Sequence, residues 1–375
     1  MPSVLISCGE PSGDLYAAAL VETLRAIDPS TTAFGFGGPR LAAAGATLIG
    51  DYRGYAVTGL AEVIRQLPRT YGMYRHLVAE ARARRPDVFV AVDFPDFNFR
   101  LGGALHGMGI PVVYYISPQL WAWRPGRLAK MKRFVEHVLV IFPFEETIYR
   151  EAGIPVTFVG HPLVELIHVR EDRAALLSRL ELQPDAPTIA LLPGSRPNEV
   201  RAILPELLAA ARLIADAEPR AQFVVARAPG LDDALFGSSF SPPPVLSVVE
   251  GATDELLAAA DAVVTASGTA TVQTALHEKP MVIVYRLSPL TYALGKRLVK
   301  VDTYGMVNLV AGRKIVPELI QNDFTSEGVA AHTLRYLHDP VHREATRDAV
   351  REVKTRLGGP GATRRAAEAI LRVAG

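Results

Sequence analysis

The chain has 375 residues, of which 49% are hydrophobic and 21% charged, and its formal net charge is +1. This composition is typical of a soluble globular protein, so it excludes a disordered chain and argues against a nucleic-acid partner. The length exceeds that of one ordinary hydrophobic core, and we therefore expect two domains.

Short apolar strands alternate with helical patterns along the chain, which predicts parallel βαβ units. Runs typical of strands occupy residues 4–7, 33–37, 88–92, 112–116, 138–142, 157–159, 188–192, 222–226, 245–249, 262–266 and 281–285. Helical patterns lie between them, and the chain from about residue 326 is helical and amphipathic. We predict two doubly wound Rossmann-like domains, at 1–165 and 166–340, and C-terminal helices at 341–375 that pack back on an N-terminal domain.

The sequence indicates neither a disulfide nor a targeting or membrane-spanning segment. Cys8 is the single cysteine, so no internal disulfide is predicted and a reducing cytoplasm is the simplest compartment. The N-terminus lacks a basic segment followed by a long apolar core, and no apolar stretch reaches the roughly 18–20 residues of a spanning helix. We expect any membrane association to be peripheral.

In the first half, polar residues follow two of the predicted strands. Asp93 and Asp96 stand at the end of strand 88–92, where open α/β sheets bind ligands, and the residues alone do not rank the two. The loop after strand 4–7 is acidic and suits sugar hydroxyls better than phosphate; it contains Glu10, Ser12, Gly13 and Asp14. The alternative for that loop is a tight turn in which Ser12 or Asp14 caps a helix.

In the second half, two turns of small residues each connect a predicted strand to a helix. A helix N-terminus offers N–H groups and a partial positive charge to an anion. Together the turns suit a diphosphate, and Arg196 adds a guanidinium clamp; they contain Gly194, Ser195 and Arg196, and Ser267, Gly268, Thr269 and Thr271. The alternatives are an ordinary connection with a solvated arginine and a Thr269 that serves only as an N-cap.

Two segments are candidates for lipid contact. Trp121 and Trp123 share one loop, and residues 55–77 combine apolar residues with arginines in an amphipathic pattern. Packing against the core is the alternative for both segments. A metal site is not expected, because the nine histidines are scattered without ligand spacing.

Nine segments in this order resemble lipid A disaccharide synthases over almost the full length of the chain. They read GEPSGD at 9–14, FGGPR at 36–40, DFPDFN at 93–98, SPQLWAWRPGR at 117–127, FPFE at 142–145, VGHP at 159–162, LLPGSR at 191–196, SGTAT at 267–271 and NLVAGR at 308–313. The resemblance implies a GT-B glycosyltransferase with two Rossmann-like domains facing across a cleft. It also implies an inverting transfer from UDP-2,3-diacylglucosamine to the 6-hydroxyl of 2,3-diacylglucosamine 1-phosphate (lipid X), without cofactor or metal.

The resemblance also implies roles for individual residues. Asp96 is expected to be the general base, with Asp93 as support for the loop. UDP or donor binding is expected at Gly194, Ser195, Arg196, Ser267, Gly268, Thr269, Thr271, Gln273, Asn308 and Arg313. Acceptor binding is expected at Glu10, Ser12, Gly13, Asp14, Asn98 and Ser117. Contact with acyl chains or the membrane is expected at Leu60, Ile64, Leu67, Tyr71, Trp121, Trp123, Arg65 and Arg69.

One position departs from the pattern. Related enzymes often carry glutamate where this chain has Gln273, which can still accept a hydrogen bond through its oxygen but has no charge. The resemblance further implies a cytoplasmic enzyme on the inner membrane, attached to anionic lipid, and a homodimer. Three alternatives stay open: another GT-B transferase acting on UDP-N-acetylglucosamine, a UDP-sugar epimerase, and a non-catalytic nucleotide- or lipid-binding scaffold.

Overall fold

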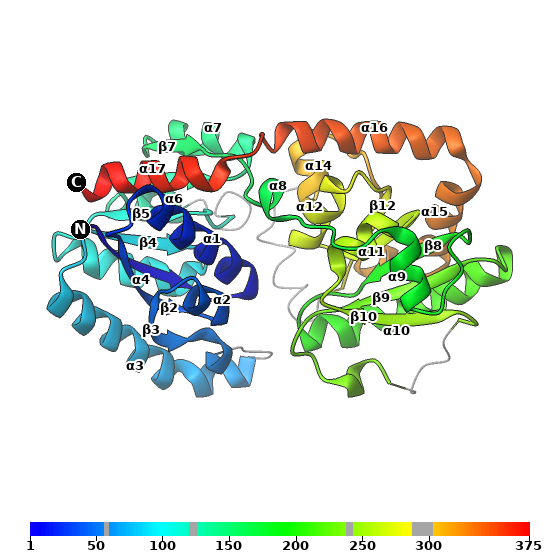
Figure 1. The fold of residues 1–375 in the computed structure, drawn as a ribbon, viewed down its shortest axis with the longest axis horizontal. Helices are drawn as coiled ribbons and strands as arrows, with labels where there is room; N and C mark the ends of the chain where they lie inside the picture. Colours follow the sequence, from blue (N-terminus) through cyan, green and yellow to red (C-terminus); the bar gives the residue numbers. More distant parts are fainter. Residues whose placement is uncertain (56–59, 120–125, 238–242, 287–302) are drawn as a thin grey trace. The chain divides into compact units, whose positions relative to one another are not determined.

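The computed structural model describes residues 1–55, 60–119, 126–237, 243–286 and 303–375. These residues form two compact units: unit 1 contains Met1–Glu165 and Leu357–Gly375, and unit 2 contains Leu166–Arg356. Each unit is a parallel sheet between layers of helices (Figure 1), so the fold is of the α/β class with two doubly wound halves.

Unit 1 is built on a seven-stranded sheet with the order β3-β2-β1-β4-β5-β6-β7, in which all neighbours are parallel. The chain fills the sheet outward from β1 in one direction and then from β4 in the other, so the order reverses between these two strands. The strands are β1 (Ser3–Cys8), β2 (Thr32–Gly37), β3 (Thr47–Asp51), β4 (Val88–Val92), β5 (Val112–Tyr115), β6 (His137–Val140) and β7 (Val156–Phe158).

Helices cover both faces of this sheet because its central strands are apolar on both sides. Every residue of β4 is buried. Leu77 and Ala81, one helical turn apart, bury the inner side of α3 against the strands, whereas α1 packs with α17. The helices are α1 (Pro11–Ile27), α2 (Pro39–Ala43), η1 (Tyr52–Tyr55), α3 (Leu60–Arg84), α4 (Pro95–His106), α6 (Gly126–Met131), α7 (Pro143–Glu151), α8 (Leu163–Leu166) and α17 (Ala362–Ala374).

The C-terminal tail is divided between the two units. Helix α16 (Pro340–Arg356) belongs to unit 2, and only α17 lies on unit 1. The carboxylate of Glu165 accepts hydrogen bonds from the backbone nitrogens of Gly361 (2.6 Å) and Thr363 (2.9 Å), at the start of α17. A carboxylate at a helix N-terminus stabilises the helix, so Glu165 fixes where the tail rejoins unit 1.

Unit 2 is built on a six-stranded parallel sheet with the order β10-β9-β8-β11-β12-β13. The strands are β8 (Thr188–Leu192), β9 (Gln222–Arg227), β10 (Leu246–Glu250), β11 (Ala262–Ala266), β12 (Met281–Tyr285) and β13 (Glu318–Ile320). The other helices are α9 (Arg173–Arg179), α10 (Pro197–Ala217), η2 (Asp233–Leu235), α11 (Thr253–Ala259), α12 (Thr269–Leu276), α14 (Met306–Ala311), η3 (Gln321–Asp323) and α15 (Ser326–His338).

Alternate residues of the central strands bury against different helices. Ile189 and Leu191 of β8 face a core that is built with α10 and α15. Helix α10 contributes Leu207 to this core, and α15 contributes Tyr336, among others. Here the strand order reverses between β8 and β11. Within the described ranges, no helix is both long enough and apolar enough to cross a membrane.

Candidate functional site

The loops of unit 1 that carry the predicted residues begin side by side. In the parallel register Cys8 pairs with Val92, Val92 pairs with Tyr115, and Ser7 pairs with Phe36. The segments after β1, β2, β4 and β5 therefore leave the sheet at the same edge, around the reversal in strand order. In open α/β sheets this edge is where ligands bind.

Asp96 lies in the first turn of α4, and the path of the chain before it is unusual. Asp93 and Phe94 both have positive φ, of 45° and 50°, although neither is glycine. Backbone of this kind costs free energy and persists only where the surroundings impose it. The Tyr114 hydroxyl donates to the Asp93 carbonyl at 2.7 Å, and the Phe94 ring stacks on Phe97 at 5.3 Å between centroids.

This constrained turn presents the Asp96 side chain to solvent. Its exposed fraction is 77%, and its carboxylate forms an ion pair with Arg127, which lies in the first turn of α6. The guanidinium of Arg127 also lies over the Phe99 ring, 5.6 Å from its centroid. An exposed carboxylate with a fixed backbone has the accessibility that a general base for an incoming hydroxyl requires.

Asp14 has a structural position. It is 1% exposed; one of its oxygens accepts from the nitrogens of Gly38 (2.7 Å) and Leu41 (3.1 Å), and the other from Arg40 (3.0 Å). These bonds cap the N-terminus of α2 and hold the loop after β2. A direct contact with an acceptor sugar would require the carboxylate to leave three partners.

Asn98 and Ser117 are buried as well. The Asn98 amide nitrogen donates to the carbonyls of Ser7 (3.1 Å) and Asp93 (2.8 Å), joining the ends of β1 and β4. The Ser117 hydroxyl bonds to the hydroxyl of Tyr149. Both residues shape the edge of the sheet around Asp96. Glu10 and Ser12 are half-buried at the start of α1, whereas Gly13 is buried.

In unit 2, the two predicted diphosphate turns also begin side by side, because β8 and β11 are neighbours with Leu192 opposite Thr265. The Glu199 carboxylate accepts from the backbone nitrogens of Ser195 (3.0 Å) and Arg196 (3.3 Å) at the start of α10. The guanidinium of Arg196 lies 3.4 Å from the same carboxylate. A diphosphate that binds these N–H groups would displace Glu199.

The second turn is partly exposed. Gly268 and Thr269 are exposed, and the Ser267 hydroxyl donates to the Tyr304 carbonyl at 3.3 Å. Thr271 is fully buried, and its hydroxyl donates to the Gly268 carbonyl at 2.8 Å. Thr271 therefore fixes the shape of the turn, while Gly268 and Thr269 present its surface.

Gln273 belongs to a polar cluster with Asp254 and His277. Its amide nitrogen donates to Asp254 at 2.7 Å, and the same carboxylate oxygen lies 3.0 Å from Nε2 of His277. Burial opposes ionisation of Asp254, but the hydrogen bonds from His277 and Gln273 outweigh it and hold its pKa below the ordinary value. The ribose contact expected of Gln273 would use its amide oxygen, which these bonds do not involve.

Asn308 is fully engaged within the protein. It is 1% exposed; its nitrogen donates to the Val316 carbonyl (2.9 Å) and Glu318 (2.8 Å), and its oxygen accepts from the nitrogens of Ile315 (2.8 Å) and Val316 (3.1 Å). It therefore braces the turn between α14 and β13. Arg313 lies at the surface and pairs with Glu352 of α16 at 3.3 Å.

The predicted lipid-facing residues are only partly described. Leu67 and Tyr71 of α3 are 53% and 59% exposed, and Arg69 is exposed as well. The side chains of Leu60, Ile64 and Arg65 lie outside the described part of the structure, and so do Trp121 and Trp123.

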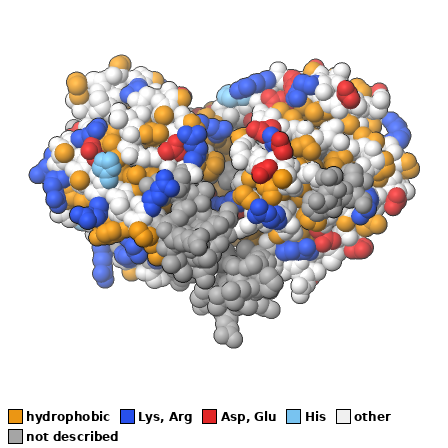
Figure 2. Space-filling model, turned by 90° about the horizontal axis from the view of Figure 1, so that it is seen from below, with side chains coloured by type: hydrophobic (Ala, Val, Ile, Leu, Met, Phe, Trp, Pro, Cys, Tyr) orange, Lys and Arg blue, Asp and Glu red, His pale blue; other side chains and the backbone are white. Residues whose placement is uncertain are grey.

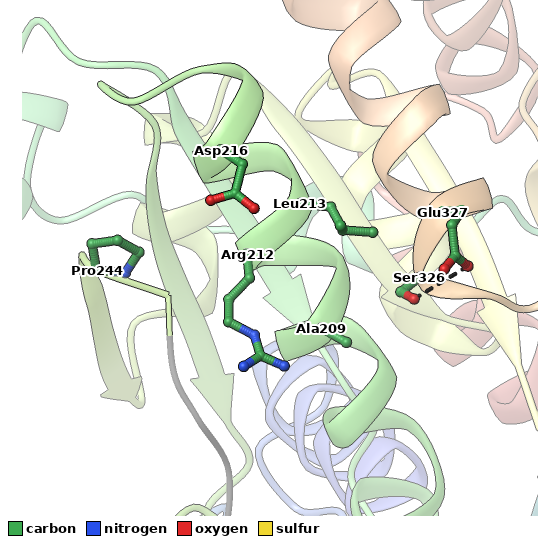
Figure 3. A pocket seen from close by; sticks show the side chains of 7 residues that line it. All are labelled: Ala209, Arg212, Leu213, Asp216, Pro244, Ser326 and Glu327. Atoms are coloured by element: carbon green, nitrogen blue, oxygen red, sulfur yellow. Dashed lines mark hydrogen bonds between the residues drawn. The ribbon is translucent and has the colours of Figure 1, made fainter.

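A surface pocket of unit 2 lies apart from these positions. It is bounded by α10, the segment before β10 and the start of α15 (Figure 3), and its lining residues are Ala209, Arg212, Leu213, Asp216, Pro244, Ser326 and Glu327. All of them are outside the predicted set. Among the described residues there is also no group of three or more His, Cys, Asp or Glu side chains that could hold a metal ion.

Four charged residues that contact the predicted positions received no role from the sequence, although the segment 117–127 ends at Arg127; they are Arg127, Glu199, Asp254 and Glu318. Each contacts a residue to which the sequence analysis had assigned a role, namely Asp96, Arg196, Gln273 and Asn308, in that order. For Glu199 a local signal existed, because glutamate at the third helical position forms a capping box. The other three contacts join different elements, which no local pattern indicates.

Comparison with known proteins agrees with the α/β fold. The sequence profile of the family described as Lipid-A-disaccharide synthetase matches residues 4–373. A Lipid-A-disaccharide synthase from Myxococcus xanthus is 44% identical over 371 residues, covering 99% of this chain and 97% of the relative. In solved structures, the fold is similar to that of the glycotransferase of kitacinnamycin (TM-score 0.67, 20% identity, full coverage of both chains). It is also similar to UDP-GlcNAc 2-epimerase from Neisseria meningitidis bound to UDP-GlcNAc (TM-score 0.70, 12% identity, 99% and 100% coverage).

Proposed function

The chain belongs to the lipid-A-disaccharide synthetase family, and from this premise we propose how its residues carry out the transfer. The reaction joins UDP-2,3-diacylglucosamine to 2,3-diacylglucosamine 1-phosphate. Its products are the β(1→6)-linked disaccharide 1-phosphate and UDP. The protein is therefore a glycosyltransferase of lipid A biosynthesis with the GT-B fold.

Asp96 is the proposed general base. It takes the proton of the acceptor 6-hydroxyl as that oxygen attacks the anomeric carbon of the donor. A new carbon–oxygen bond forms, the bond to the UDP phosphate breaks, and UDP leaves with its electron pair. Attack from the face opposite UDP inverts the anomeric carbon, which agrees with a β product from an α-linked donor.

The leaving diphosphate is assigned to the neighbouring turns of unit 2. Arg196 and the turn at Gly268 and Thr269 supply a guanidinium and a helix N-terminus, both of which stabilise developing negative charge. The observation that carries the proposal is the placement of both turns at the reversal of strand order in unit 2, while the exposed Asp96 holds the corresponding position in unit 1.

The test of the base is Asp96→Asn, which preserves size but cannot take the proton. Incubation with both substrates and mass spectrometry should show the disaccharide with wild-type protein and a loss of at least 1000-fold, as an order-of-magnitude expectation, with the variant. Binding of UDP, measured by calorimetry, should be unchanged. Asp216→Asn, the same substitution at an exposed position of unit 2, is the control and should retain full activity. Turnover near wild type in the Asp96 variant would refute the assignment.

The epimerase alternative is not favoured. The structures with that name share the fold at low identity, whereas the transferase relatives match at 41–46% identity over nearly the whole chain. Incubation with UDP-N-acetylglucosamine alone, followed by separation of the sugar isomers, distinguishes the two activities. Conversion without an acceptor would support the epimerase.

We also propose that the outer side of α3 attaches unit 1 to anionic lipid. Leu67, Tyr71 and Arg75, spaced four residues apart, are exposed there, Arg69 is exposed as well, and α3 lies at the lower edge of unit 1 in Figure 1. Figure 2 shows hydrophobic and basic side chains together on this face of the unit. Both substrates carry acyl chains, so a position at the lipid surface brings the enzyme to them.

Vesicle co-sedimentation tests the α3 surface. Arg69→Glu with Arg75→Glu should weaken binding to phosphatidylglycerol vesicles by at least about 30-fold, since each cation near an anionic surface contributes about 1 kcal/mol. Arg212→Glu with Arg220→Glu makes the same charge change at exposed positions of unit 2 and should have little effect. Equal loss in the two double variants would count against a specific surface.

A further inference from the structure

The ion pair between Asp96 and Arg127 has a consequence for the acceptor. Arg127 belongs to α6, and its guanidinium lies between the Asp96 carboxylate and the face of the Phe99 ring. Its side chain is 24% exposed, whereas that of Asp96 is 77% exposed. One edge of the guanidinium can therefore meet an anion that arrives at Asp96 from solvent.

This pair engages Oδ1 of the Asp96 carboxylate. A carboxylate oxygen that accepts a charge-assisted hydrogen bond from a guanidinium is less accessible to an incoming hydroxyl. The acceptor hydroxyl would reach this oxygen more freely once Arg127 had another anionic partner. The acceptor itself brings such a partner, because it carries a phosphate as well as the reacting hydroxyl.

We propose that Arg127 binds the 1-phosphate of the acceptor and, in doing so, releases the carboxylate of Asp96 to act on the 6-hydroxyl. This inference rests on the proposed function. It assigns Arg127 as the residue that selects a phosphorylated acceptor over the same lipid without phosphate.

The chemistry of the acceptor fits this arrangement. The phosphate and the hydroxymethyl group are attached to the two carbons that flank the ring oxygen, so both lie on the same edge of one sugar. A hydroxyl bound to Asp96 thus brings the phosphate close to a guanidinium that touches Asp96. A phosphate monoester carries a charge of about −1.5 to −2 near pH 7 and accepts a bidentate bond from arginine, so it competes effectively with a single carboxylate.

The experiment compares two acceptors, diacylglucosamine with and without the 1-phosphate, in a disaccharide assay with wild-type protein, Arg127→Ala and Arg127→Lys. Wild type should prefer the phosphorylated acceptor in kcat/KM. Arg127→Ala should lose on the order of 10- to 100-fold with that acceptor, the range for a charged hydrogen bond, and little with the other. Arg127→Lys, which keeps the charge without the fork, should fall between them.

The control is Arg150→Ala, which removes an exposed arginine of unit 1 that pairs with Glu146 at 2.8 Å. It should preserve the preference for phosphate. Equal losses on both acceptors in Arg127→Ala would overturn the proposal, because they would mean that Arg127 only orients Asp96. An unchanged preference would overturn it as well.

A binding measurement separates this inference from the proposed function. Glucosamine 1-phosphate, followed by its ³¹P resonance, should bind more weakly to Arg127→Ala than to wild type. It should bind Asp96→Asn at least as tightly as wild type, because the competing carboxylate is gone. This pattern supports the phosphate site even if wild type forms no disaccharide, whereas equal affinity in wild type and Arg127→Ala refutes the site even if the transferase is active.

Discussion

Asn308 provides a sharp test, because the structure buries its side chain within the protein, whereas its predicted role is to bind the donor. The family resemblance assigns it to the donor, but in the structure its amide makes four hydrogen bonds to residues of the same turn and of β13. Asn308→Ala removes all four at a site that is 1% exposed. If the amide is structural, the variant should lose stability rather than a contact with UDP.

The expected loss follows from those bonds. A hydrogen bond contributes about 1 kcal/mol net, and a buried donor or acceptor left without a partner costs about 1–3 kcal/mol. In the variant, the nitrogens of Ile315 and Val316 lose their acceptor, and Glu318 keeps its bonds from Tyr304 (2.9 Å) and Gly305 (2.9 Å). We expect a decrease of about 4 kcal/mol in the free energy of unfolding of unit 2.

Urea unfolding followed by circular dichroism measures that decrease, and calorimetry at low temperature measures the affinity of the folded variant for UDP. The affinity should fall less than tenfold, which corresponds to about 1.4 kcal/mol. Asn322→Ala, the same substitution at an exposed position of η3, should change stability by no more than about 0.5 kcal/mol. A stable Asn308 variant that no longer binds UDP would refute a purely structural role for the amide. It would support a direct contact between Asn308 and the donor.

Three other predictions follow from local features. Gly9→Ala places a Cβ 2.3 Å from the Phe94 ring, which is stacked on Phe97, so the turn that carries Asp96 must shift. We expect kcat, measured by steady-state kinetics, to fall at least about tenfold. The melting temperature, measured by scanning calorimetry, should fall only slightly. Burial lowers the pKa of His161 to about 3, so the unfolded chain binds a proton that the folded one does not as pH falls below about 6.5. Between pH 7 and pH 5, the free energy of unfolding of wild type in urea should therefore fall by about 2 kcal/mol more than that of His161→Gln. Finally, disaccharide formation should be unaffected by EDTA, and strong inhibition that Mg²⁺ reverses would contradict metal-independent transfer.

Much of the fold could be predicted from the sequence because the strands are buried on both sides. The run at 88–92 is uninterruptedly apolar and corresponds to β4, in which every residue is buried. Two strands were missed for the opposite reason. β3 is nowhere fully buried, and β13 has three half-buried residues, so neither shows a long apolar run; β7 is equally short and half-buried, but the run at 157–159 predicted it.

The motifs identified the right regions but not the work of each side chain. Asp14 and Asn308 belong to family motifs, yet both are buried with their polar atoms bonded within the protein. A motif records that a residue type matters at a position. It does not tell a ligand contact from the hydrogen bond that shapes the loop beside the ligand, since both favour the same polar side chains.

By itself, the sequence determined the α/β class, the two doubly wound halves and the family, because strand burial, strand–turn–helix order and short motifs are local properties. Only the tertiary structure decided which partners the polar residues have. Arg127 meets Asp96 across 31 positions of the chain, and α16 and α17 lie on different units although both are amphipathic. Such contacts depend on how distant elements pack, and the pattern within one element carries no information about its neighbour.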